Sequence, residues 1–248
     1  MPSTNSASVC IESLNLLSNL LVRYLHHTHR FFESLLPILK MLNKVAIPSP
    51  PLGLPVSPLV NCLVSLPFKD ESGHATQRHL FPSFDSNINI NKLINILDLA
   101  VQAYSDDAMN THGSPLVQLL IRIAEAAPPK PKAHLRARLL PSDQDREIVL
   151  GTGNSLPHML LKLCTAPTVQ YLQQLVPALL FEMSDKDPKR FTRNVGYGQV
   201  VGYLFSMGVQ LSPEDLEPGG SGNTMERFEC NPILARDRTW NPSMTYQR

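Results

Sequence analysis

The amino-acid sequence predicts an all-α fold in which pairs of helices stack into an armadillo/HEAT-like α-solenoid. Leucine recurs at steps of three and four residues, as on the apolar face of a helix, whereas alternating Val, Ile and Thr runs typical of strands are nearly absent. Prolines number 22 and glycines only 12. The prolines separate the leucine-rich stretches. Each would end a helix, because proline lacks a backbone N–H and restricts the residue before it.

The N-terminal part is expected to contain two helices and a linker. Apolar residues share one helical face over residues 10–25 and again over residues 30–45. Pro37 should either kink the second helix or mark its late start. Residues 47–58 contain five prolines and are expected to form a linker without helical structure.

Further helices alternate with loops in the rest of the chain. Residues 67–87 are polar and predict a long surface loop, and residues 130–146 are rich in Lys and Arg and predict another. Helix pairs of about forty residues would stack as in armadillo or HEAT proteins, with an irregular helical bundle as the alternative. The helices are expected over residues 58–66, 90–104, 114–127, 155–164, 169–183, 186–193 and 197–207.

Two regions of different character follow from this pattern. Residues 9–211 are expected to form one helical-repeat domain. Residues 212–248 show no apolar period and include a Gly-Gly-Ser-Gly run, which predicts a disordered tail.

Composition restricts the partners and the compartment. A formal net charge of +1 gives no overall field that would attract nucleic acid or an anionic membrane. Cys10, Cys62, Cys164 and Cys230 are far apart and form no CxxC pair, so they predict reduced thiols in a cytoplasmic protein. The N-terminus does not resemble a secretory signal, and charged residues interrupt the long apolar stretches, so no transmembrane segment is expected.

No pattern indicates covalent catalysis, a cofactor or a metal. His26, His27 and His29 have no accompanying ligands and point in different directions on a helix, so they are expected to be solvated near a helix C-terminus. Residues 151–154 and 196–198 contain glycines but lack the spacing of a phosphate-binding loop. We therefore expect no catalytic, cofactor-binding or metal-binding residues.

Two charged segments have both a structural and a functional interpretation. Lys130, Lys132, Arg136 and Arg138 predict either a solvated loop or a loop that binds an acidic protein surface. Ser212 precedes two carboxylates in the tail. It predicts either a solvated linker or a phosphorylation site whose charge would hold the tail against basic helix ends.

The segment from Leu140 to Leu211 resembles the synembryn family of G-protein α-subunit exchange factors and chaperones, and its sequence is most similar to the fungal branch of that family. The resemblance includes Leu-Pro-Ser-Asp at residues 140–143 and Leu-Leu-Phe-Glu-Met-Ser-Asp-Lys-Asp at residues 179–187. Its most specific part is Asn-Val-Gly-Tyr-Gly at residues 194–198. A weaker similarity extends over residues 10–234.

The family motif singles out Asn194, Gly196, Tyr197, Gly198 and Gly202. The three glycines are expected to let a turn and the following helix approach a neighbour closely. Replacement of Gly202 by Leu would then destabilise the fold by overpacking.

The resemblance implies a guanine nucleotide exchange factor and folding chaperone that grips the nucleotide-free G-protein α subunit (Gα) without a covalent step. It implies a cytoplasmic location that extends to the cell cortex, with peripheral membrane association through Gα. A generic helical-repeat adaptor without exchange activity is the alternative. Compared with the family, N-terminal repeats are expected to be missing, and the chain departs from the family's ending after Leu234.

Overall fold

The computed structural model describes residues 4–68 and 77–209, and every regular element in these ranges is a helix. The all-α prediction is therefore confirmed. The predicted tail, with Ser212, lies outside the described residues. The α-helices are α1 (Thr4–Arg23), α2 (Leu35–Lys44), α3 (Val56–Ser65), α4 (Gln77–Leu80), α5 (Ile88–Ala103), α6 (Asp106–His112), α7 (Ser114–Ala126), α8 (Pro129–Leu139), α9 (Leu156–Thr165), α10 (Leu172–Met183), α11 (Pro188–Val195) and α12 (Tyr197–Ser206).

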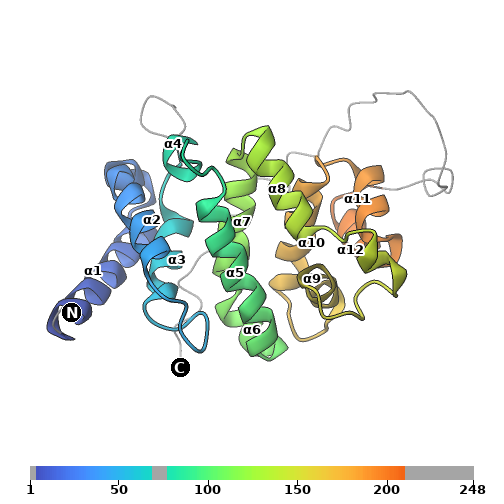
Figure 1. Cartoon of the computed structure of the whole chain (residues 1–248), viewed down its shortest axis with the longest axis horizontal. Helices are drawn as coiled ribbons and strands as arrows, with labels where there is room; N and C mark the ends of the chain where they lie inside the picture. The colour runs from blue at the N-terminus through green and yellow to red at the C-terminus, as the bar shows by residue number, and fades with distance from the viewer. Residues whose placement is uncertain (1–3, 69–76, 210–248) are drawn as a thin grey trace.

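The helices form two stacked layers (Figure 1). Helices α3, α7 and α10 pack side by side in one layer, which we call the inner layer, and α2, α5 and α9 pack against it. α1 packs on α3 at one end of the stack, and the α11–α12 pair packs on α10 at the other end. Successive pairs therefore follow one another along the long axis, as the predicted solenoid requires.

The repeat is longer than the sequence pattern suggests. The three inner helices begin at Val56, Ser114 and Leu172, which places them at intervals of 58 residues. Besides one helix of the second layer, the first interval contains α4 and α6, and the second interval contains α8. The expected period of about forty residues is too short for this reason.

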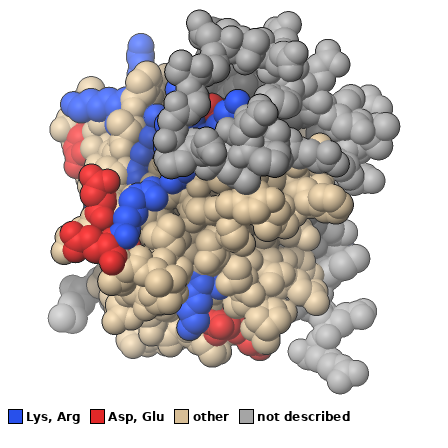
Figure 2. Space-filling view, turned by 90° about the vertical axis from the view of Figure 1, so that its right-hand side faces the viewer, with Lys and Arg blue, Asp and Glu red and all other residues tan. Residues whose placement is uncertain are grey.

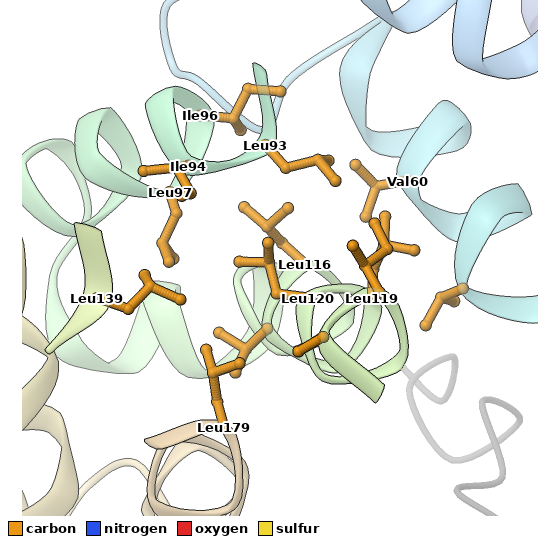
Figure 3. Close-up of a cluster of buried hydrophobic side chains, with 14 of the residues drawn as sticks. Val60, Leu93, Ile94, Ile96, Leu97, Leu116, Leu119, Leu120, Leu139 and Leu179 are labelled. Carbon is orange, nitrogen blue, oxygen red and sulfur yellow. The ribbon is translucent and has the colours of Figure 1, made fainter. Parts of the chain in front are cut away.

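A continuous core joins the layers. Leucine and isoleucine side chains of α3, α5, α7, α8 and α10 meet in one buried cluster, part of which is drawn in Figure 3. At the end of the stack, Phe181 of α10, Phe191 of α11 and Tyr203 of α12 pack edge to face, with ring centroids 5.3 to 6.1 Å apart. These three rings fasten the last helix pair to the inner layer.

Prolines end helices as predicted. Leu66, Ala127, Leu140 and Ala166 are the C-cap residues of α3, α7, α8 and α9, and each is extended and directly precedes a proline. The proline ring disfavours the helical conformation at the preceding residue, so the chain leaves the helix there. None of these four ends has the C-terminal glycine that would satisfy the last carbonyls.

Basic side chains from other elements bind carbonyls at four helix C-termini. Each contact joins residues that are 47 or more positions apart in the chain. The positive charge also interacts favourably with the negative end of the helix dipole. The contacts are Lys92 Nζ to Val45 O (2.6 Å) after α2, Arg122 to Leu63, Val64 and Leu66 O at α3, Arg136 Nε to Met183 O (2.8 Å) at α10, and Arg146 to Arg193 and Asn194 O at α11.

The segment at residues 130–146 was expected to be a loop, but residues 130–139 belong to helix α8. The sequence prediction was wrong here since Pro129 and Pro131 suggest a break. Both prolines lie in the first turn of the helix, where backbone N–H groups have no partner within the helix. Pro131, Leu135 and Leu139 form its buried side. The charged residues between them mask this apolar spacing.

Two other differences concern short helices. The expected loop at residues 67–87 contains α4, and α6 has no counterpart in the prediction, since Met109 is its only buried residue. Pro37 marks a late start, as one alternative predicted. A 3₁₀ helix (Leu25–Ser34) precedes α2, and Pro37 occupies the first turn of α2.

Arg122 offers a test of the capping contacts. Its guanidinium donates to Leu66 O at 2.7 Å and to Leu63 O at 3.2 Å, and it lies 4.2 Å from the centroid of the Phe68 ring. Arg122→Met should lower the free energy of unfolding by about 2–4 kcal/mol, because several part-buried carbonyls lose a charged donor. Arg122→Lys should recover only part of this loss, since an ammonium group cannot span the same carbonyls.

The measurement is urea-induced unfolding followed by circular dichroism. Arg138→Met is the matched control, because Arg138 lies on the exposed side of α8 and has no ion pair among residues 4–68 and 77–209. A loss for Arg122→Met no larger than that of the control would contradict the capping role.

Candidate protein-binding site

The free face of the inner layer is a surface to which several repeats contribute. The buried sides of α3, α7 and α10 face their neighbours and the second layer, which leaves one exposed line of side chains on each helix. Asn61, Gln118 and Gln174 lie one on each inner helix and are not buried, and we call them the amide row.

The amide row has free hydrogen-bonding capacity. Asn61 and Gln118 are half-buried and Gln174 is exposed, and none of their side chains bonds to another residue that the structure describes. Each amide offers a carbonyl acceptor and two N–H donors, which suits the backbone of a bound segment. Sequence reasoning missed this row, because single Asn and Gln residues at intervals of about one repeat are visible only after the period is known.

The basic stretch divides into two pairs of residues. Lys132 and Arg136 point toward α10, where Lys132 Nζ lies 2.6 Å from Glu182 Oε1 and Arg136 pairs with Asp185. Lys130 and Arg138 are exposed and have no ion pair with any described residue. The stretch is therefore chiefly a structural contact between α8 and α10, and only its outer pair is available to a partner.

Glu182 is the buried centre of this contact. Its side chain is 6% exposed and lies 2.6 Å from Lys132 Nζ and 3.1 Å from Lys186 Nζ. Burial raises the pKa of the Glu182 carboxyl, but hydrogen bonds from Lys132 and Lys186 outweigh it and hold the pKa below its usual value. Glu182 is thus held ionised, and Lys186 also reaches Glu125 of α7 at 3.6 Å.

The turn between α10 and α11 is strained and held by charge. Asp185 and Lys186 have φ values of 61° and 56°, a left-handed conformation that costs a side-chain-bearing residue about 1–3 kcal/mol. Arg136 and Arg190 both pair with the Asp185 carboxylate, while Lys186 pairs with Glu182. Two successive strained residues persist because ion pairs fix their side chains in place. The sequence reveals the motif residues here but gives no sign of the strain.

The family-motif residues lie in α11 and α12. Asn194 Nδ2 donates to Ser184 Oγ at 3.0 Å, which ties α11 to the strained turn. Gly196 joins the two helices with φ 90°, a value that favours glycine, and a Cβ there would lie 3.5 Å from Leu150 Cδ1. Tyr197 begins α12 and is 44% exposed.

Gly198 and Gly202 do not have the role that the sequence suggests. Both are exposed, and no described atom lies within 4 Å of a Cβ built at either position. The close approach expected at these two glycines is therefore wrong for the described residues. It is found instead at Gly153, where a Cβ would lie 2.7 Å from His158 Cδ2.

A compact polar cluster shapes the loop between α8 and α9. The Asp145 carboxylate accepts hydrogen bonds from Ser142 Oγ at 2.7 Å and Ser155 Oγ at 2.6 Å. Burial raises the pKa of Asp145, but these hydrogen bonds and the one from the Ser142 backbone N–H lower it by more. The pKa of Asp145 is therefore below its usual value.

His158 completes this cluster as a structural residue. It is 1% exposed, accepts from Gly151 N at Nδ1 (3.0 Å) and donates from Nε2 to Asp145 O (3.0 Å). Since both ring nitrogens are occupied by the backbone, His158 is not positioned to activate either serine.

The remaining titratable candidates do not gather into a site. His26 and His27 are exposed in the 3₁₀ helix that follows α1. Burial raises the pKa of the Cys62 and Cys164 thiols to about 12, which keeps them protonated. Within the described ranges no group of three or more His, Cys, Asp or Glu residues is placed to hold a metal ion. No helix in those ranges is long and apolar enough to cross a membrane.

Comparison of the sequence with known proteins identifies a family. A sequence model described as guanine nucleotide exchange factor synembryn matches residues 1–245. No curated protein matches the chain.

Lys132 tests the buried ion pair. Lys132→Met should lower the free energy of unfolding by about 1–3 kcal/mol near neutral pH, because Glu182 keeps only one of its two close cations. The pKa of Glu182 is depressed in the folded protein, so its contribution is complete above the unfolded pKa and is lost as pH falls through the folded value. The difference in the free energy of unfolding between Lys132→Met and wild type should therefore become smaller below about pH 4.3.

Urea unfolding at several pH values measures this effect, with Lys130→Met as the matched control on the exposed side of α8. The control should change stability by less than about 0.5 kcal/mol. Equal effects of the two variants would show that Lys132 and Glu182 contribute no specific pairing.

Gly202 and Gly153 form a second contrasting pair. Gly202→Ala should raise the free energy of unfolding by about 0.5–1 kcal/mol, because this exposed helical position has room for a methyl group. Gly153→Ala should lower it by about 1–3 kcal/mol, because the methyl group would overlap His158. Thermal unfolding of both variants measures these changes. A lower melting temperature for Gly202→Ala would show that Gly202 is closely packed after all.

Proposed function

Because the chain belongs to the guanine nucleotide exchange factor synembryn family, we propose that it binds a heterotrimeric G-protein α subunit and promotes exchange of its nucleotide. The family match over residues 1–245 is the observation that carries this proposal. The stacked helical layers support it, since solenoids provide extended surfaces for protein partners.

The proposed mechanism is selective binding of one Gα conformation. A partner that binds the open, nucleotide-free form more tightly than the GDP-bound form shifts the population toward opening, so GDP leaves faster. Binding of GTP reverses the shift and releases the partner. The same preference would protect a newly made α subunit while it folds, which is the chaperone activity. No bond to the substrate is made or broken by residues of this chain.

We propose that a Gα segment lies across the amide row. The inner layer is rigid there, since its helices share one core and their ends are held by cross-chain contacts, so little ordering is needed on binding. Asn61, Gln118 and Gln174 would each bond to polar groups of the segment. Lys130 and Arg138 would form ion pairs with acidic residues of the partner. This interaction would bring the chain to the cytoplasmic side of the plasma membrane and the cell cortex.

The test is nucleotide release from purified Gα loaded with a fluorescent GDP analogue. The full chain should accelerate release and should form a complex with nucleotide-free Gα that GTP dissociates. Absence of both effects would refute the proposal. Stable binding to other proteins with no effect on nucleotide would instead support the adaptor alternative.

A variant at the centre of the amide row locates the site. Gln118→Trp should weaken binding to nucleotide-free Gα by about tenfold or more, because a clash in the middle of an interface costs more than about 1.4 kcal/mol. Gln102→Trp is the control, since Gln102 is exposed on α5 in the other layer. Equal binding by both variants would place the Gα segment elsewhere on the chain.

A further inference from the structure

The last helix of the stack carries an exposed apolar line. Tyr197, Val201 and Phe205 are 44%, 40% and 75% exposed. They follow one another at intervals of four residues on α12, so they lie along one side of the helix. We call these three residues the terminal stripe. The adjacent Gly198 and Gly202 have no side chains that could cover it.

This line lies where the stack ends. Helix α12 packs on α9, α10 and α11, and its opposite side has no further described helix against it. Figure 2 shows this end of the molecule, where Lys and Arg side chains run along one side of a broad surface without charge. In a stacked-helix protein a terminal helix needs a polar outer face to remain soluble. An apolar one therefore indicates a surface that is covered in solution.

A segment of the same chain that follows α12 in the sequence has apolar side chains that would cover it. Residues 225–240 follow α12 outside the described ranges. They contain five large apolar residues, Met225, Phe228, Ile233, Leu234 and Trp240. The family match extends to residue 245 and so includes this segment.

The connection between the two is long enough. Residues 210–224 contain the Gly-Gly-Ser-Gly run and number 15, and a random coil of that length would span about 22 Å on average. Helix α12 has ten residues and is about 15 Å long, so the segment can reach all of the stripe without strain. A connection of this length would also give an effective concentration in the millimolar range, which favours the chain's own segment over a second copy.

We propose that residues 225–240 fold back and pack their apolar side chains on the terminal stripe of α12. The segment then serves as the cap of the solenoid, and part of the tail is ordered by this contact. The proposal does not depend on binding to Gα, because the stripe and the segment both belong to this chain.

The chain provides its own probe, since Trp240 is its single tryptophan. In the full chain, Trp240 emission should lie at shorter wavelength than that of N-acetyltryptophanamide and should be protected from iodide quenching. Phe205→Asp should lower the docking equilibrium constant by about tenfold or more, as expected for one aromatic side chain removed from an apolar contact. Emission should then shift to longer wavelength, and quenching should increase. Val201→Asp should act in the same direction.

Leu16→Asp is the matched control, because Leu16 is 60% exposed on α1 at the opposite end of the stack. It should leave Trp240 emission unchanged, and circular dichroism should show the same helix content in all variants. Solvent-like emission in the wild-type chain, or emission unaffected by Phe205→Asp, would overturn the proposal. A blue shift that disappears on dilution would also overturn it, since it would assign the stripe to a second copy.

Discussion

The contacts between basic side chains and the C-terminal ends of helices hold the stack in register. Five of the described helices, α2, α3, α7, α8 and α9, end in an extended residue, so their last carbonyls lack the usual glycine-based partners. At two of these ends, α2 and α3, Lys92 and Arg122 supply donors from other elements. Arg136 and Arg146 do the same at α10 and at α11, which end differently. A helix end is thereby tied to a distant segment, and the relative position of two helices is set by charge as well as by apolar packing.

This arrangement explains how a glycine-poor chain maintains long-range order. Contacts between leucine side chains specify the relative position of two helices less strictly, because apolar contacts are non-directional. A guanidinium that must reach several carbonyls tolerates much less, since its donors have fixed directions. The strained turn at Asp185 and Lys186 belongs to the same system, as Arg136 bonds both to the end of α10 and to Asp185. Order at the α11–α12 end therefore depends on a residue of α8.

The sequence predicted the helices from leucine spacing and their ends from proline. These signals are local, and so they survive without knowledge of the fold. The sequence-based prediction failed at α8, where two prolines in the first turn of a helix resemble a helix break. It also failed at Gly202, where the family motif suggested a close approach that the structure has at Gly153 instead. It also missed the amide row, because Asn61, Gln118 and Gln174 are related only once it is known that helices 58 residues apart in the chain stack. Relations between repeats require the tertiary structure.

The distribution of polar groups suits binding better than chemistry among the described residues. Glu182 is neutralised by two lysines, Asp145 is saturated by serine donors, and both nitrogens of His158 are bonded to the backbone. Groups engaged in this way stabilise the fold and are poorly placed to transfer protons. The amides of the inner layer and the apolar line of α12 are instead left open. A surface of this kind gains energy only by pairing with another segment, and it favours whichever conformation of the partner exposes that segment.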